Sequence, residues 1–136
     1  MNQLSILLIE DDPDDIELMH EALKNVDIAY SLEVVSQGDK VLPYLEVCKK
    51  FPNVIILDLN LPKLHGREVL ALLKNSNRFK DIPVAILTTA SSQKEKEYCL
   101  SAGADQFLTK PSTVEGFNQT IKIIKNIATR SVIKEY

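Results

Sequence analysis

Acidic, hydroxyl and basic side chains stand at the ends of short apolar runs in this sequence, and together they could do chemistry. Asp11 and Asp12 follow the first run, Asp58 the third, Thr88 the fourth and Lys110 the fifth. Because three carboxylates packed together repel one another, they need a cation among them, and hard oxygen ligands suit Mg²⁺. An ammonium group and a hydroxyl beside such a site favour phosphoryl transfer, which depends mostly on positioning and charge neutralisation. We therefore predict that Asp58 is a nucleophile that forms an aspartyl phosphate, with Lys110 and Thr88 holding phosphoryl oxygens.

Other polar residues near these runs have a simpler interpretation. Asp14, Asp15 and Glu17 fall in a predicted first helical turn, where negative side chains interact favourably with the helix dipole. We therefore predict that these three acids lie outside the site. His65 precedes Gly66 at a predicted turn, and we interpret it as a surface residue.

Five short runs alternate with amphipathic segments along the chain. Four of the runs are continuous and rich in Ile, Val and Leu, which is typical of strands buried on both faces of a parallel sheet. Between the runs, apolar residues recur at helical spacing, and this spacing predicts helices that pack on the sheet. The predicted strands are Leu4–Ile9, Leu32–Val35, Val54–Leu57, Val84–Leu87 and Gln106–Thr109.

The segment 92–102 differs from the other predicted helices because its first half is polar all round. Only Tyr98, Cys99, Leu100 and Ala102 can bury much apolar surface there. We therefore predict that this helix is the least well anchored of the set.

Alternating strands and helices predict a doubly wound α/β domain with a five-stranded parallel sheet. The common strand order for such a domain is 2-1-3-4-5, the flavodoxin-like or CheY-like (βα)5 arrangement, which places the topological switch point between strands 1 and 3. Ligands bind beyond the carboxyl ends of the strands at that point. The predicted sheet therefore gathers the acids, the hydroxyl and the ammonium at one edge.

Composition excludes several classes of protein. The chain has 136 residues, 45% hydrophobic and 26% charged, which fits one globular domain. The net charge of −3 gives no sign of nucleic-acid binding. No apolar run is long enough to span a membrane, and the N-terminus does not resemble a signal peptide, so we expect a soluble cytoplasmic protein. Cys48 and Cys99 have no metal-binding or redox spacing, and we expect reduced, packed thiols.

Four fragments at predicted strand ends resemble those of response-regulator receiver domains of two-component signalling. Any one of them is a weak signal, but all four occur in order. The resemblance covers Ser5 to Ile127 and implies a receiver domain over residues 1–127, with 128–136 as a tail or a helix extension. The fragments are Ile6-Leu7-Leu8-Ile9-Glu10-Asp11-Asp12, Ile56-Leu57-Asp58-Leu59-Asn60-Leu61-Pro62 with Gly66, Ile86-Leu87-Thr88-Thr89-Ala90, and Phe107-Leu108-Thr109-Lys110-Pro111.

The resemblance assigns a role to each matching position. Asp58 matches the phosphoacceptor, and Asp11 and Asp12 match the acidic pair that holds Mg²⁺. Asn60 matches the residue whose backbone carbonyl completes the metal shell. Thr88 matches the switch hydroxyl and Phe107 the switch aromatic, while Lys110 matches the family's lysine. The resemblance also implies a cis peptide bond between Lys110 and Pro111.

The resemblance further implies a function and partners. A sensor histidine kinase, or a phosphotransfer protein, would phosphorylate Asp58, and the chain would catalyse only its own phosphorylation and dephosphorylation. The sequence looks most like stand-alone regulators partnered with bacterial phytochromes. Movement of Thr88 and Phe107 would reshape the face made by segment 92–102, strand 106–109 and the last helix. The output would be a contact with a downstream protein or a homodimer, to which Val132, Ile133 and Tyr136 could add.

Three alternatives remain at this point. A phosphatase of the haloacid dehalogenase type also uses a strand-end Asp and Mg²⁺, but it wants a second carboxylate where this chain has Asn60. A flavodoxin-like electron carrier needs a phosphate loop after strand 1, where acids would repel a cofactor phosphate. A degenerate receiver would bind partners without being phosphorylated.

Overall fold

The computed structural model describes residues 3–89 and 92–134, with side chains described as far as residue 129. Within these ranges the chain forms one five-stranded parallel sheet in the order β2-β1-β3-β4-β5. The predicted fold class and strand order are therefore confirmed. Three predicted strands have the predicted bounds, whereas the second begins two residues earlier and the fourth ends one residue later. The strands are β1 (Leu4–Ile9), β2 (Tyr30–Val35), β3 (Val54–Leu57), β4 (Val84–Thr88) and β5 (Gln106–Thr109).

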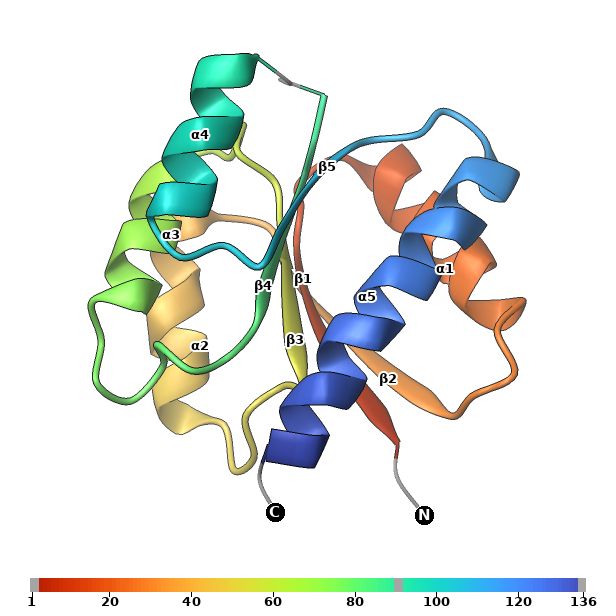
Figure 1. Ribbon diagram of the computed structural model, residues 1–136, viewed down its shortest axis with the longest axis horizontal. Coiled ribbons are helices and arrows are strands. Elements are labelled where there is room, and N and C mark those ends of the chain that lie inside the picture. Colours follow the sequence, from red (N-terminus) through yellow and green to blue (C-terminus); the bar gives the residue numbers. More distant parts are fainter. Residues whose placement is uncertain (1–2, 90–91, 135–136) are drawn as a thin grey trace.

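Helices cover both faces of the sheet. Helices α2, α3 and α4 lie on one face, and α1 and α5 lie on the other (Figure 1). A short 3-10 turn, η1, leads directly into α2. The helical elements are α1 (Pro13–Lys24), η1 (Gly38–Lys40), α2 (Val41–Val47), α3 (Gly66–Lys74), α4 (Gln93–Ser101) and α5 (Val114–Lys134).

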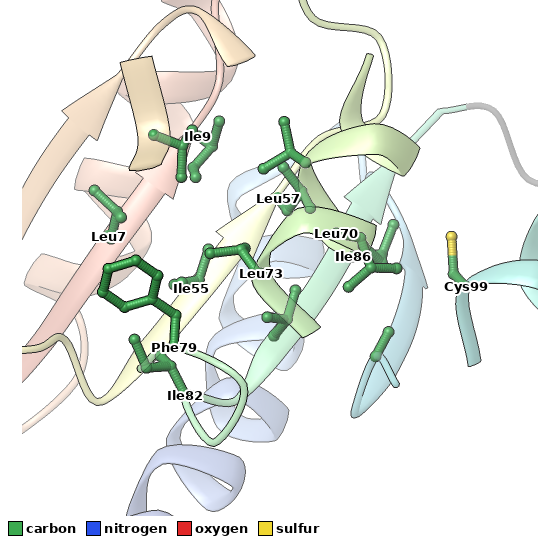
Figure 2. Packing of buried hydrophobic residues seen from close by; sticks show 14 of the residues in the cluster. Leu7, Ile9, Ile55, Leu57, Leu70, Leu73, Phe79, Ile82, Ile86 and Cys99 are labelled. Atoms are coloured by element: carbon green, nitrogen blue, oxygen red, sulfur yellow. The ribbon is translucent and has the colours of Figure 1, made fainter. Parts of the chain in front are cut away.

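Two hydrophobic clusters fill the space between the sheet and its two helical layers. Alternate residues of each strand point to opposite faces, so Leu7 and Ile9 join the cluster under α2 and α3, whereas Ile6 and Leu8 join the cluster under α1 and α5. Figure 2 shows the first cluster, with Phe79 packed beside the β1 and β3 residues. Strands β1, β3 and β4 are buried on both faces, as continuous apolar runs predict.

Strand β2 departs from that pattern. It is half-buried along its length, and Glu33 is exposed. The strand forms the edge of the sheet and pairs with β1 alone, so the helical layers cover it less completely. The prediction of burial on both faces is therefore wrong for this run.

Helix α4 is weakly anchored, as its composition predicts. Cys99 is its one fully buried residue between Gln93 and Ser101, whereas Tyr98 and Leu100 are each 42% exposed. Of the four residues that can bury apolar surface, Tyr98 and Leu100 therefore do so only in part. Arg67 of α3 contacts α4 at the surface. It forms an ion pair with Glu95 at 3.2 Å, and its guanidinium lies 5.1 Å from the centre of the Tyr98 ring.

The last helix continues well beyond the predicted core stripe. It packs against α1 and runs to Lys134, so residues 128–134 prolong the helix. Ala90, Tyr136 and the side chains of Val132 and Ile133 lie outside the described part of the chain. No helix in that part has the length and apolar character needed to cross a bilayer.

Candidate functional site

The register of the sheet brings the residues that follow β1 and β3 side by side. Ile9 pairs with Leu57, so Glu10 and Asp58 come next on neighbouring strands. Side chains alternate along each strand, which turns Glu10 and Asp58 toward the α1 side of the sheet. Lys110, two residues after Leu108 on β5, points to the same side. The sheet therefore gathers two carboxylates and one ammonium at the carboxyl ends of three strands.

Lys110 is the centre of this arrangement. Its Nζ lies 2.7 Å from Glu10 Oε1, 2.7 Å from Asp15 Oδ2 and 3.0 Å from Asp58 Oδ2. The side chain is only 7% exposed, and an ammonium has three donors to give. Burial alone would lower the pKa of Lys110, but the hydrogen bonds to Asp15, Glu10 and Asp58 outweigh it and raise the pKa. Lys110 therefore keeps its charge throughout the physiological range.

Glu10 is a buried carboxylate that sequence reasoning did not assign to the site. Its Oε1 accepts from Lys110, and its Oε2 accepts from the backbone amides of Asp11 and Asp12 at 3.1 and 3.2 Å. Burial raises the pKa of the Glu10 carboxyl to about 7, and the neighbouring Asp58 charge adds to this rise while Lys110 opposes it. The signal that could have found Glu10 is its position, because it follows β1 directly, as Asp58 follows β3.

Carboxylate oxygens of Glu10, Asp11 and Asp58 lie within 4.8 Å of one another. Such a cluster of hard oxygen ligands fits Mg²⁺. Asp12 is not part of this cluster. Its carboxylate caps the start of α1 and accepts from the backbone amide of Asp14 at 2.9 Å. The acidic pair beside Asp58 is thus Glu10 and Asp11, one residue earlier than the predicted pair of Asp11 and Asp12.

Asp15 also lies elsewhere than expected. It belongs to the first turn of α1, as predicted, but its carboxylate faces the sheet and contacts Lys110 instead of remaining solvated. Its side chain is 20% exposed, and the neighbouring Asp14 is fully on the surface. Helical periodicity separates these two acids, because residues next to each other on a helix point about 100° apart.

The segment between β3 and α3 wraps around Asp58. The backbone amide of Asn60 donates to Asp58 Oδ1 at 3.4 Å, and Gly66 donates to the carbonyl of Leu59 at 2.8 Å. A Cβ on Gly66 would lie 2.2 Å from the carbonyl oxygen of Asp58, so a side chain cannot fit there without shifting this segment. His65 is partly exposed, and its Nδ1 caps α3 by accepting from the amide of Arg67.

Thr88 and Phe107 lie near the same edge of the sheet but on its other face. Thr88 ends β4 and is fully buried, and its carbonyl accepts from the amide of Lys110 at 2.9 Å. Phe107 is partly buried and packs against the hydrophobic cluster under α2 and α3. Thr88 therefore ends the strand that lies between those of Asp58 and Lys110, and Phe107 lies on the side of the sheet that α3 and α4 cover.

The backbone at Lys110 differs from the expectation. The bond between Lys110 and Pro111 is trans, so the cis bond that the resemblance implied is wrong for this structure. The lysine reaches the carboxylates from the trans backbone.

Both cysteines are free thiols, as expected. Cys48 is partly buried, and Cys99 is the fully buried residue of α4. Burial raises the pKa of the Cys99 thiol to about 11, which keeps it protonated and unreactive. Neither cysteine belongs to the site.

Comparisons with known proteins agree on one family. A family profile described as "Response regulator receiver domain" matches residues 6–122. The response regulator Rcp1 of Synechocystis sp. is 33% identical over 132 residues, which cover 93% of this chain and 90% of Rcp1. A crystal structure of the Mn²⁺-bound form of Rcp1 superposes with a TM-score of 0.80 over 89% of this chain and 91% of that one, at 33% identity. The phosphorylated cyanobacterial phytochrome response regulator RcpA gives a TM-score of 0.85 at 32% identity, over 94% of this chain and 95% of that one.

Proposed function

The chain belongs to the response regulator receiver family, and we propose that it accepts a phosphoryl group on Asp58 in an Mg²⁺-dependent reaction. The observation that carries this proposal is the position of the Asp58 carboxylate. It lies at the end of β3 with Oδ2 bonded to Lys110 and with Glu10 and Asp11 oxygens in the same cluster. A carboxylate can attack phosphorus only if the negative charge around it is neutralised. The Lys110 ammonium supplies one positive charge, and an Mg²⁺ ion held by the acidic cluster would supply the rest.

Each residue of the site has its own role in the proposed reaction. Glu10, Asp11 and Asp58 would hold Mg²⁺, together with the backbone carbonyl of Asn60, and the bound ion would neutralise part of the phosphoryl charge. One Asp58 carboxylate oxygen attacks the phosphorus atom of the donor and forms a new P–O bond. The bond between phosphorus and the leaving group breaks at the same time, and the histidine imidazole of a kinase, or the acetate of acetyl phosphate, departs. Lys110 donates to a phosphoryl oxygen, and its buried ammonium needs no reorganisation to do so.

The proposed conformational switch would follow from the negative charge that phosphorylation adds at Asp58. The phosphoryl group brings new acceptor oxygens to the end of β3, and the Thr88 hydroxyl moves to donate to one of them. Phe107 then turns into the space that Thr88 leaves. The exposed α4, β5 and α5 face changes shape, and α4 can shift at low cost because Cys99 is its one fully buried side chain.

Partners follow from the family and from the relatives. We propose a sensor histidine kinase, or a phosphotransfer protein, as the donor, and a phytochrome-like kinase because RcpA is a phytochrome response regulator. Because the chain belongs to the receiver family and its relative Rcp1 is a response regulator, we propose a cytoplasmic regulator that catalyses only its own phosphorylation and dephosphorylation. Its output would be a contact with a downstream protein or a homodimer, without nucleic acid or membrane.

Labelling of the purified chain tests this proposal directly. Incubation with acetyl phosphate and Mg²⁺ is expected to add one phosphoryl group, seen by intact-protein mass spectrometry, because the donor needs no protein partner. Chelation of divalent ions with EDTA is expected to prevent the addition. A chain that is not labelled, or is labelled equally in EDTA, would contradict the proposal.

Two single substitutions test which acids hold the ion. Asp11→Asn is expected to weaken Mg²⁺ binding at least about tenfold, because it removes one of the clustered carboxylates. Asp12→Asn is the matched control, since Asn caps helices as well as Asp and the Asp12 carboxylate serves α1. Its Mg²⁺ affinity is expected to stay within about twofold of the wild type. Isothermal titration calorimetry measures the Mg²⁺ affinity of both variants. A larger loss of affinity in Asp12→Asn would favour Asp11 and Asp12 as the metal-binding pair, as predicted from the sequence.

A further inference from the structure

Asp15 stands apart from the other acids that contact Lys110. Glu10 and Asp58 belong to the cluster that fits a cation, and Asp58 is also the proposed nucleophile. Asp15 comes from α1 and does not belong to that cluster, yet its Oδ2 lies 2.7 Å from Lys110 Nζ. It is as close to the ammonium as Glu10 and closer than Asp58.

From this contact we propose that Asp15 is a positioning residue that aims Lys110 during phosphoryl transfer. The inference rests on the proposed function and extends it. When Asp58 reacts, its carboxylate becomes part of an acyl phosphate and loses its negative charge, so it holds the lysine less strongly. Of the three carboxylates around the ammonium, Asp15 alone has no other task in the reaction. It therefore holds Lys110 against α1 while another donor of the ammonium points at the phosphoryl group.

The anchoring is rigid on both sides. Asp15 lies in the first turn of a helix whose start is fixed by Pro13 and by the Asp12 cap. The backbone amide of Lys110 is fixed by the carbonyl of Thr88. A charge-assisted hydrogen bond between two such fixed elements restricts a long, flexible side chain to one direction. Asp14, which neighbours Asp15 in the same turn, is exposed and lacks this geometry.

The test is a double-mutant cycle on the rate of labelling at saturating Mg²⁺ and acetyl phosphate. Asp15→Ala is expected to slow labelling about tenfold, the effect of losing one hydrogen bond to a charged group. In a Lys110→Ala background, the same change is expected to slow it by less than about twofold, because Asp15 acts through Lys110. Asp14→Ala removes the same charge from the same helical turn and is expected to keep the wild-type rate.

A second readout does not depend on activity. In protein labelled with ¹⁵N-lysine, the Lys110 ammonium is expected to give a slowly exchanging NMR signal that Asp15→Ala weakens and Asp14→Ala preserves. An unchanged signal in Asp15→Ala would overturn the inference, as would an unchanged labelling rate. An equal loss of rate with and without Lys110 would also overturn it, because Asp15 would then act by supporting α1. Failure of wild-type labelling together with an Asp15-dependent ammonium signal would refute the proposed function instead.

Discussion

Asp58→Asn is expected to abolish labelling by acetyl phosphate while the chain remains folded. The neutral amide is a poor nucleophile, and Asp58 is the described carboxylate that both contacts Lys110 and directly follows β3. Glu10 is held more tightly than Asp58, because its Oε2 accepts from two backbone amides at 3.1 and 3.2 Å whereas Asp58 Oδ1 accepts from one at 3.4 Å. The expected loss is therefore complete within the sensitivity of mass spectrometry.

The fold should tolerate this change well. Asn has nearly the same shape as Asp, and Lys110 keeps its bonds to Glu10 and Asp15. Asp14→Asn serves as the matched control, since it removes one charge from an exposed acid and should leave labelling unchanged. Labelling of Asp58→Asn at the stoichiometry of the wild type would refute the assignment of the phosphoacceptor. Peptide mapping of the labelled wild-type chain would then locate the true acceptor.

Lys110→Met is expected to lower the free energy of unfolding by about 3–5 kcal/mol at pH 8, the range seen when one partner of a buried ion pair is removed. The Glu10 and Asp58 side chains are only 4% and 6% exposed and would lose the cation between them. Met preserves the length and packing of the side chain, so the loss reports charge. Urea unfolding followed by circular dichroism measures it, and Lys94→Met on the exposed surface of α4 is the control.

The loss should depend on pH in a defined direction. Burial raises the pKa of Glu10 from 4.5 to about 7, so the folded chain binds a proton that the unfolded chain has lost between these values. Stability therefore falls as pH rises through this window. Without Lys110 the pKa of Glu10 should rise further, so the defect of Lys110→Met should be smaller at pH 5.5 than at pH 8. A defect of equal size at both values, or none at pH 8, would contradict the role given to Lys110.

Local patterns predicted the sheet well because they depend on short segments. The apolar runs marked every strand, and the register then placed Asp58 and Lys110 at one edge, where both are found. Helix α4 was correctly predicted to be weakly anchored. The sequence left open how far Tyr98 and Leu100 are buried, because that depends on how the helix is rotated against its neighbours.

The acids after β1 show what short patterns leave undecided. Five acids fall within six residues there, and composition alone gives them similar roles. Strand alternation turns Glu10 inward, the cap takes Asp12, and helical rotation brings Asp15 to Lys110. Each outcome requires knowing where β1 ends and α1 begins to within one residue. The predicted pair, Asp11 and Asp12, therefore differs by one residue from the acids that cluster with Asp58, which are Glu10 and Asp11, and the contact between Asp15 and Lys110 was not predicted.

The contacts between Arg67 and α4 bear on how the position of this helix can be adjusted. Arg67 lies in the first turn of α3, which follows the segment after Asp58. On the surface of the molecule its side chain contacts Glu95 and Tyr98 of α4. The Arg67 side chain is 50% exposed, and ion pairs at such surfaces weaken as ionic strength rises. We expect the resting position of α4 to respond to salt and to substitutions at these three residues while the interior stays unaltered. Under the proposed switch, substitutions at Arg67, Glu95 or Tyr98 would therefore change how readily α4 moves without altering the side chains around Asp58.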